Sequence, residues 1–288
     1  MCGEYTARIG STCSNYVPQP DTSRRIGSVN MWRHRQMVFE LIRRDIVGRY
    51  KGAFLGSAWS LLNPLLMLAV YSFVFGGIFR SRWRSSDAGF LDFAVPMFAG
   101  MILFNIFSEV ATRAPTLVQN HANFVKKVVF PLDTLTVMTA GTALFHYFLA
   151  LIVLLLGTFA LHGFIPLTVF LVPVVITPYL LFVLGIGWFL ASLGVFVRDL
   201  AQFVNIAVSV LMFLAPIFFP ISAVPTTLQP LIHLNPITIP VEAIRSICVL
   251  GELPDWFALA EYSVIAAVVA YLGHQWFERT RKGFADVL

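Results

Sequence analysis

The stretch LTVMTAGTALFHYFLALIVLLLGTFAL, Leu135–Leu161, decides the fold of this 288-residue chain. It contains no Asp, Glu, Lys or Arg, and as a helix it exceeds the roughly 30 Å hydrocarbon core of a bilayer. The other apolar runs of this kind are Ser60–Phe79, Phe93–Thr112, Leu167–Val197, Leu200–Phe219 and Phe257–Phe277. The sequence therefore predicts an all-α polytopic membrane protein with six transmembrane helices.

Composition agrees with one membrane domain rather than several soluble ones. The chain is 58% hydrophobic and 12% charged, whereas about 25% of the residues of an average soluble domain are charged. We expect the six-span domain to cover residues 60–288, with spans at about 60–79, 93–112, 135–161, 167–197, 200–219 and 257–277.

The Lys and Arg residues gather at one set of ends of these runs. With the N-terminus in the cytoplasm, all but four of the 20 lie on the inner side, the exceptions being Arg80, Arg82, Arg84 and Arg245. Because inner loops are enriched in Lys and Arg, we expect both termini to be cytoplasmic. The net charge of +5 follows the membrane rather than one basic soluble face, so we expect no nucleic-acid partner.

Two segments precede the first span. Residues 1–30 are polar and rich in Ser, Thr and Pro, which predicts a disordered cytoplasmic tail. Residues 31–59 predict a helix with apolar side chains at three- and four-residue spacing, accompanied by basic residues that include Arg43, Arg44 and Arg49. Such a helix is typical of the membrane interface, where arginines bind lipid phosphates. An ordinary soluble helix packed on a partner is the alternative.

The segment between the fifth and sixth runs differs from both a span and a free loop. It carries five prolines between residues 221 and 255, and Glu242 and Arg245 interrupt its most apolar part. We expect short re-entrant helices here, with their irregular backbone shielded by protein.

Motifs for chemistry are missing. The sequence has no G-x-x-x-x-G-K-[ST] phosphate loop and no H-E-x-x-H, and its six histidines lack ligand spacing. We therefore expect no catalytic residue, no metal site and no cofactor in this chain, with His146 and His274 as hydrogen-bonded packing residues. Glu109 and Glu261, the two acids inside the runs, are either proton-relay groups or interfacial side chains near span ends.

Two runs carry a polar and aromatic stripe at helical spacing. The first-run stripe comprises Ser60, Asn63, Met67, Tyr71 and Phe75, and the fifth-run stripe comprises Gln202, Asn205, Ser209 and Phe213. Polar groups facing lipid are costly, so we expect both faces to turn inward. Inward means either a helix–helix contact joined by hydrogen bonds or a hydrated path for a substrate such as a sugar.

Four stretches resemble one family. They are RRDIVGRYKGAFLGSAWSLLNPLLMLAVYSFVFGGIFR at 43–80, FVKKVVFPLD at 124–133, VFVRDLAQFVNIAVSVLMFLAPIFFP at 195–220 and HLNPITIPVEAIR at 233–245. Together they resemble the permease subunits of ABC transporters that export lipid-linked polysaccharides. These stretches are most similar in sequence to the branch that exports O-antigen or capsular polysaccharide.

The resemblance implies a homodimer in the bacterial inner membrane, paired with two copies of an ATP-binding subunit that holds the ATP and Mg²⁺. It implies that both stripes line the substrate path, and that Asn123, Phe124, Lys126 and Lys127 dock on the ATPase. In a simpler interpretation the two lysines only anchor the topology.

Three alternatives stay open: a teichoic-acid exporter, a drug exporter with a smaller and more uniformly apolar cavity, and a membrane-embedded glycosyltransferase. The last needs clustered acids, whereas Asp133 and Asp199 are isolated in the sequence.

Overall fold

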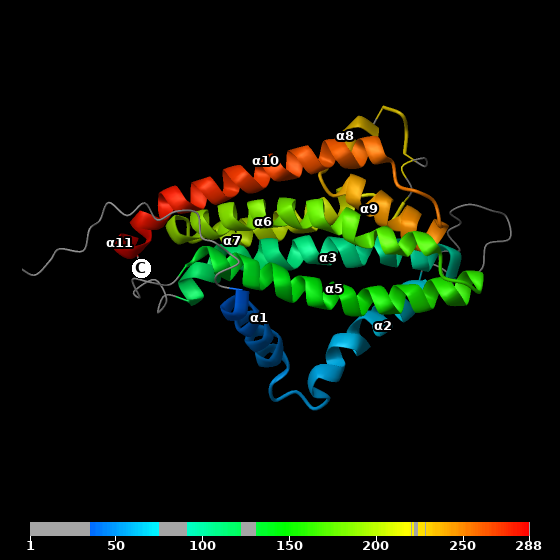
Figure 1. Cartoon of the computed structure of the whole chain (residues 1–288), viewed down its shortest axis with the longest axis horizontal. Coiled ribbons are helices and arrows are strands. Elements are labelled where there is room, and N and C mark those ends of the chain that lie inside the picture. Colours follow the sequence, from blue (N-terminus) through cyan, green and yellow to red (C-terminus); the bar gives the residue numbers. More distant parts are fainter. Residues whose placement is uncertain are drawn as a thin grey trace, which may run out of the picture.

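The computed structural model describes residues 35–74, 91–121, 131–219, 221, 224–227 and 229–287, and over these residues the only regular structure is helical (Figure 1). The predicted tail at 1–30, the stripe residue Phe75 and the proposed docking residues at 123–127 lie outside the described residues.

Four long helices form the body of the molecule. They are α3 (Leu91–Asn120), α5 (Asp133–His162), α6 (Val172–Phe196) and α10 (Trp256–Thr280). They run side by side along the long axis, with α3 in contact with α5 and α6, and α6 in contact with α10 (Figure 1). Helix α3 is the central one, because more of its length is buried than of any other candidate span among the described residues.

Five segments of the described chain are long and apolar enough to cross a membrane: Gly56–Val74, Phe93–Asn120, Asp133–His162, Leu167–Phe196 and Trp256–Gly283. The remaining predicted span, the fifth along the chain at 200–219, is shorter than expected. Helix α7 (Leu200–Leu214) has 15 residues, about 22 Å at 1.5 Å per residue, and stops before Phe219. Ala215 is extended, as is usual for a residue that precedes proline.

The expected 167–197 run begins with a 3₁₀ turn, Leu167–Leu171, before α6. Among the described residues between α7 and α10 lie three short helices, as the broken sequence predicts. They are α8 (Gln229–His233), α9 (Thr238–Arg245) and the π-helical turn Ser246–Leu250. Helix α9 is largely buried and contacts α3. A 3₁₀ turn (Arg281–Gly283) and α11 (Phe284–Val287) close the described chain.

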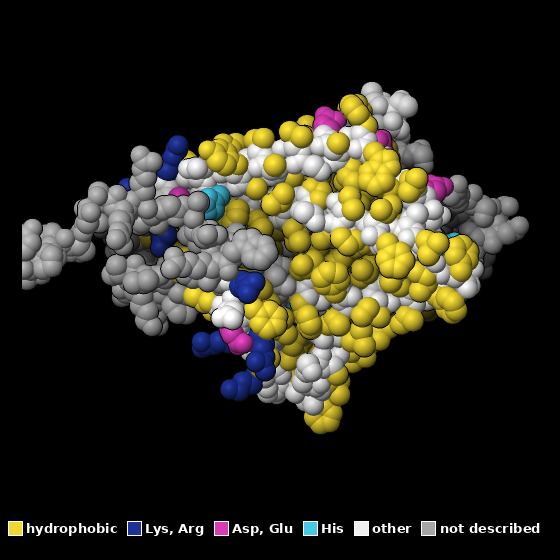
Figure 2. All heavy atoms as spheres, viewed as in Figure 1, with side chains coloured by type: hydrophobic (Ala, Val, Ile, Leu, Met, Phe, Trp, Pro, Cys, Tyr) yellow, Lys and Arg dark blue, Asp and Glu magenta, His cyan; other side chains and the backbone are white. Residues whose placement is uncertain are grey.

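The outside of the molecule is apolar over a broad area (Figure 2). Large side chains such as Phe148, Phe159, Phe203, Phe257 and Tyr271 are at least half exposed, which suits lipid rather than water. The Lys and Arg side chains visible in Figure 2 lie towards the end of the bundle that carries α1 and α11. The chain is therefore a multi-pass membrane protein.

Helix α1 (Arg35–Tyr50) and α2 (Trp59–Tyr71) form a V whose apex projects from the bundle (Figure 1). The turn at the apex depends on Gly52 and Gly56, whose φ angles of 87° and 51° favour glycine.

Helix α1 packs on α5 through Ile42, which touches Gly141 so closely that a side chain there would collide with it. Arg43 and Arg44 are exposed, and so is Phe39, one of the apolar side chains at three- and four-residue spacing, at 66%. The apolar side chains of α1 therefore point in different directions, because Ile42 packs on α5 and Phe39 faces outward.

Candidate functional site

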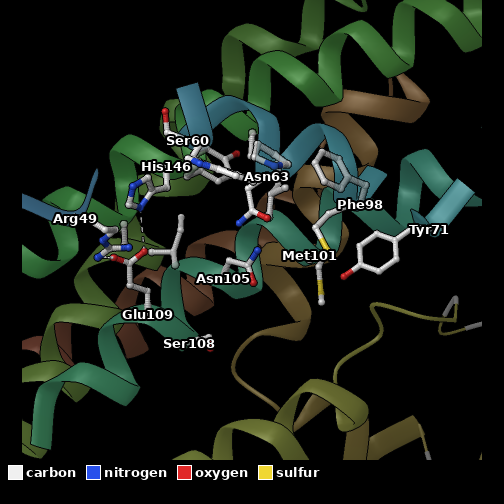
Figure 3. Close-up of a pocket in the computed structure, with 18 of the residues that line it drawn as sticks. Arg49, Ser60, Asn63, Tyr71, Phe98, Met101, Asn105, Ser108, Glu109 and His146 are labelled. Atoms are coloured by element: carbon white, nitrogen blue, oxygen red, sulfur yellow. Dashed lines mark hydrogen bonds and ion pairs between the residues drawn. The ribbon is translucent and has the colours of Figure 1, made fainter. Parts of the chain in front are cut away.

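A groove of about 680 Å³ lies between α2 and the bundle, floored by α3 and α5 (Figure 3). Its lining mixes charged, amide, hydroxyl, aromatic and thioether groups. The residues that contribute them are Arg49, Ser60, Asn63, Met67, Tyr71, Phe98, Met101, Asn105, Ser108, Glu109 and His146.

One wall is the stripe predicted on the first run. Ser60, Asn63, Met67 and Tyr71 recur every three or four residues, so they share a face of α2, and all four line the groove. Leu65, on the opposite face of α2, is exposed and does not line the groove. The structure therefore places the described part of this stripe on a polar cavity, with a lipid-compatible face behind it.

The facing wall comes from α3 and includes residues that the sequence reasoning missed. Met101, Asn105 and Ser108 line the groove, and Figure 3 shows Asn63 and Asn105 directed into the same space. The sequence did contain a pattern that could have indicated them, because the three residues recur at four- and three-residue spacing within a largely apolar run. Without a facing stripe beside it, that spacing also fits packing.

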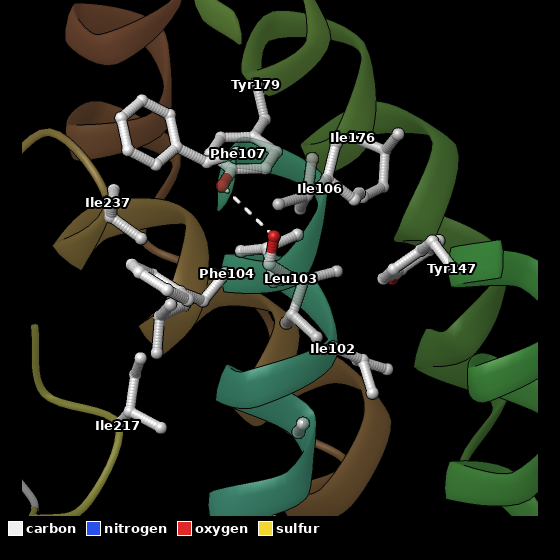
Figure 4. Close-up of a cluster of buried hydrophobic side chains, with 14 of the residues drawn as sticks. Ile102, Leu103, Phe104, Ile106, Phe107, Tyr147, Ile176, Tyr179, Ile217 and Ile237 are labelled. Carbon is white, nitrogen blue, oxygen red and sulfur yellow. Dashed lines mark hydrogen bonds between the residues drawn. The ribbon is translucent and has the colours of Figure 1, made fainter. Parts of the chain in front are cut away.

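Behind this wall the bundle is closely packed. Tyr179 of α6 donates its hydroxyl hydrogen to the carbonyl of Leu103 at 3.1 Å, and Ile106 and Tyr147 lie in the same buried cluster (Figure 4). Such packing holds the polar face of α3 in one orientation.

A charged cluster closes one end of the groove. Arg49 of α1 donates to Glu109 of α3, and His146 Nδ1 of α5 lies 3.2 Å from the other carboxylate oxygen. The second ring nitrogen of His146 lies 3.0 Å from the hydroxyl of Tyr50. Three helices therefore meet in one hydrogen-bonded network.

A second ion pair reinforces this junction. Both terminal nitrogens of Arg113 donate to the carboxylate of Asp45, at 2.9 and 2.7 Å. Burial alone would raise the pKa of Asp45, but hydrogen bonding and charge attraction from Arg113 hold its pKa below the ordinary value. Helix α1 is thus tied to α3 by charge as well as to α5 by packing.

These contacts change the interpretation of the two acids inside the runs. Glu109 is not alone, because it lies within α3 and pairs with Arg49, Arg113 and His146. Glu261 is exposed in the second turn of α10, as expected for an interfacial side chain.

The fifth-run stripe lies elsewhere. Asn205, Ser209 and Phe213 are exposed on the outside of α7, and Ser209 donates only to the carbonyl of Asn205 in its own helix. Val204 and Val208, on the other side of α7, are buried against the bundle. The two stripes therefore do not meet within one chain.

Arg245 was expected as an outer basic residue, yet its side chain is almost wholly buried. It donates to the carbonyls of Pro216 at 2.7 Å and Pro96 at 3.3 Å, and to Glu242 at 2.6 Å. It therefore joins α9 to α3 and to the break after α7. No local signal distinguishes such an arginine from an exposed one.

Fold and groove together define a helical membrane protein with a polar path-like cavity beside its central helix. The chain belongs to the ABC-2 type transporter family, which matches residues 36–249. It is 26% identical over 258 residues to the O-antigen export system permease protein RfbA of Myxococcus xanthus, covering 89% of this chain and 96% of the relative. Two proteins of the same name from Klebsiella pneumoniae are each 23% identical, over 91% of this chain and their whole length. The resemblance to ABC permeases found in the sequence is confirmed.

Proposed function

We propose that this chain is the membrane subunit of an ATP-driven exporter that moves lipid-linked polysaccharide, O-antigen or capsular, across a bacterial inner membrane. The family and the named relatives support this function over teichoic-acid export and glycosyl transfer. The observation that carries it is the groove on α2, because amide and hydroxyl groups alternate there with aromatic and thioether surfaces. Sugars need both, whereas a drug exporter would be expected to have a more uniformly apolar cavity.

The groove can be tested by filling it. Asn63→Trp and Met67→Trp place bulk in the cavity, while Leu65→Trp places the same bulk on the exposed opposite face of the same helix. We expect the first two variants to reduce surface polysaccharide per membrane-inserted permease several-fold, and the third to export normally. Normal export by both groove variants would refute the role of this groove.

The α7 stripe requires a second copy of the chain if it is to border the same path. We propose a homodimer in which the exposed face with Asn205, Ser209 and Phe213 lies at the seam between protomers. Exposed amide and hydroxyl groups beside exposed Phe203 and Ile206 suit a protein contact better than lipid. Oxidative cross-linking of Ser209→Cys, in a background with Cys2 and Cys13 changed to Ser, should give a covalent dimer, and Leu66→Cys in that background should not.

Six spans with both termini cytoplasmic remain our proposed topology, with α7 as the short fifth span. The charge asymmetry supports it. Single cysteines at Ser85 and Gln229 should be labelled from outside and one at Asn120 from inside. External labelling at position 120 would refute this arrangement.

ATP hydrolysis is proposed to occur on two copies of a separate subunit, which carry the ATP and Mg²⁺. Residues 122–130 join α3, which carries Glu109, to α5, which carries His146, so a force on this segment can reach the groove. Phe124→Ala, or Lys126→Glu with Lys127→Glu, should lower export while insertion stays normal. Export at the parent level would leave the lysines as topology anchors only, and hydrolysis by the purified chain alone would refute the separate ATPase.

A further inference from the structure

The fold brings together three ligand-type side chains that are far apart in the sequence. Asp133 begins α5, and His274 and Glu278 lie one turn apart on α10. One potential ligand atom from each lies within 4.8 Å of the others. The sequence had left Asp133 without a second carboxylate and His274 as a packing residue, so this cluster was not foreseen.

The carboxylate of Asp133 is the unusual member. Its side chain is 4% exposed, and Oδ1 has no hydrogen-bond partner among the described residues. Its other oxygen, Oδ2, is 3.8 Å from His274 Nε2, longer than a hydrogen bond. A buried carboxylate oxygen without a partner is costly unless something positive binds it.

Neighbouring groups hold the cluster in place. The indole nitrogen of Trp188 donates to the backbone carbonyl of Asp133 at 3.0 Å, and its ring meets His274 edge-on with centroids 5.0 Å apart. Arg281 lies 3.6 Å from Oε1 of Glu278, on α10's own continuation. This cation balances part of the negative charge but leaves Oδ1 of Asp133 unpaired in the described structure.

We propose that Asp133, His274 and Glu278 form a binding site for a divalent metal ion of the Zn²⁺ type. One imidazole nitrogen and two carboxylate oxygens suit Zn²⁺ better than Ca²⁺ or Mg²⁺, which prefer oxygen ligands throughout. In a tetrahedral zinc site, ligand atoms are about 3.4 Å apart, so small side-chain rotations close the observed spacing. An ion there joins the first turn of α5 to the last turns of α10, directly after segment 122–130.

The site can be tested on the full-length chain in nanodiscs, stripped with a chelator and then titrated with Zn²⁺. We expect one Zn²⁺ per chain, measured by calorimetry and by metal analysis, and a rise in the thermal unfolding midpoint. His274→Gln and Glu278→Gln should weaken binding at least about 100-fold, since even outer-shell changes cost 10- to 100-fold. The matched control is His162→Gln, which removes an exposed histidine at the other end of α5.

Co²⁺ provides a second measurement. Bound in a tetrahedral site with a nitrogen ligand it should give a visible absorption band, which His274→Gln abolishes and His162→Gln retains. Absence of stoichiometric Zn²⁺ in the parent chain, or equal affinity in all variants, would overturn the proposal and leave an internal Asp133–His274 ion pair. Neither result depends on export activity, so the metal site and the proposed function can fail separately.

Discussion

Replacing Arg245 by methionine tests how the broken segment between α7 and α10 is held. Methionine replaces the aliphatic stem of the arginine but removes the guanidinium group and all of its donors. The carbonyls of Pro216 and Pro96 then lose this donor, and Glu242 loses its ion pair. An unsatisfied buried acceptor costs about 1–3 kcal/mol, whereas Glu242, with a side chain 38% exposed, recovers water. We expect a loss of about 4 kcal/mol, close to two such acceptors.

The loss should be measured as the change in free energy of unfolding in detergent, titrated with SDS and followed by tryptophan fluorescence. Arg43→Met is the control, because Arg43 is 71% exposed and pairs only loosely with Glu40, at 4.0 Å. Exposed pairs contribute about 0–1 kcal/mol. If Arg245→Met and Arg43→Met differ by less than about 1 kcal/mol, the buried arginine does not hold the segment as argued.

Three further predictions concern the helix junctions. Glu109→Gln should lower the free energy of unfolding by about 2 kcal/mol, because one charged partner of a partly buried network is lost. It should also increase hydrogen exchange in α1, and unchanged exchange would refute the role of this network in holding α1. Gly273→Ala should lower the unfolding midpoint, since its Cβ would collide with the carbonyl oxygen of Gly185, whereas an alanine at Gly48, which has open space, should have little effect on packing. The pKa of Asp45 is depressed in the folded chain, so the stability from its pair with Arg113 is present above about pH 4 and is lost as pH falls below that value. Asp45→Asn should weaken the packing of α1 on α3 at pH 7 and make stability depend less on acid pH.

Much of the fold could be predicted from the sequence because membrane insertion depends on local quantities. The run at Leu135–Leu161 is long and uncharged, so its helix, Asp133–His162, follows from apolar length alone. The broken segment could also be predicted, since its prolines and the charged residues Glu242 and Arg245 prevent one continuous span. Helix α7 ended early for a similarly local reason, the proline at 216, which the sequence reasoning did not weigh.

Side-chain partners were decided only by the tertiary structure. The stripe on α2 was visible as a period of three to four residues, but only the packing of α2 beside α3 made it one wall of a groove. Glu109 and Arg49 are 60 positions apart, and Asp133 and His274 are further apart still. The sequence determined which helices form, because hydrophobicity and turn chemistry act within a few residues. Which charges meet depends on how those helices cross, and that is set by long-range close packing such as the contact between Gly185 and Gly273.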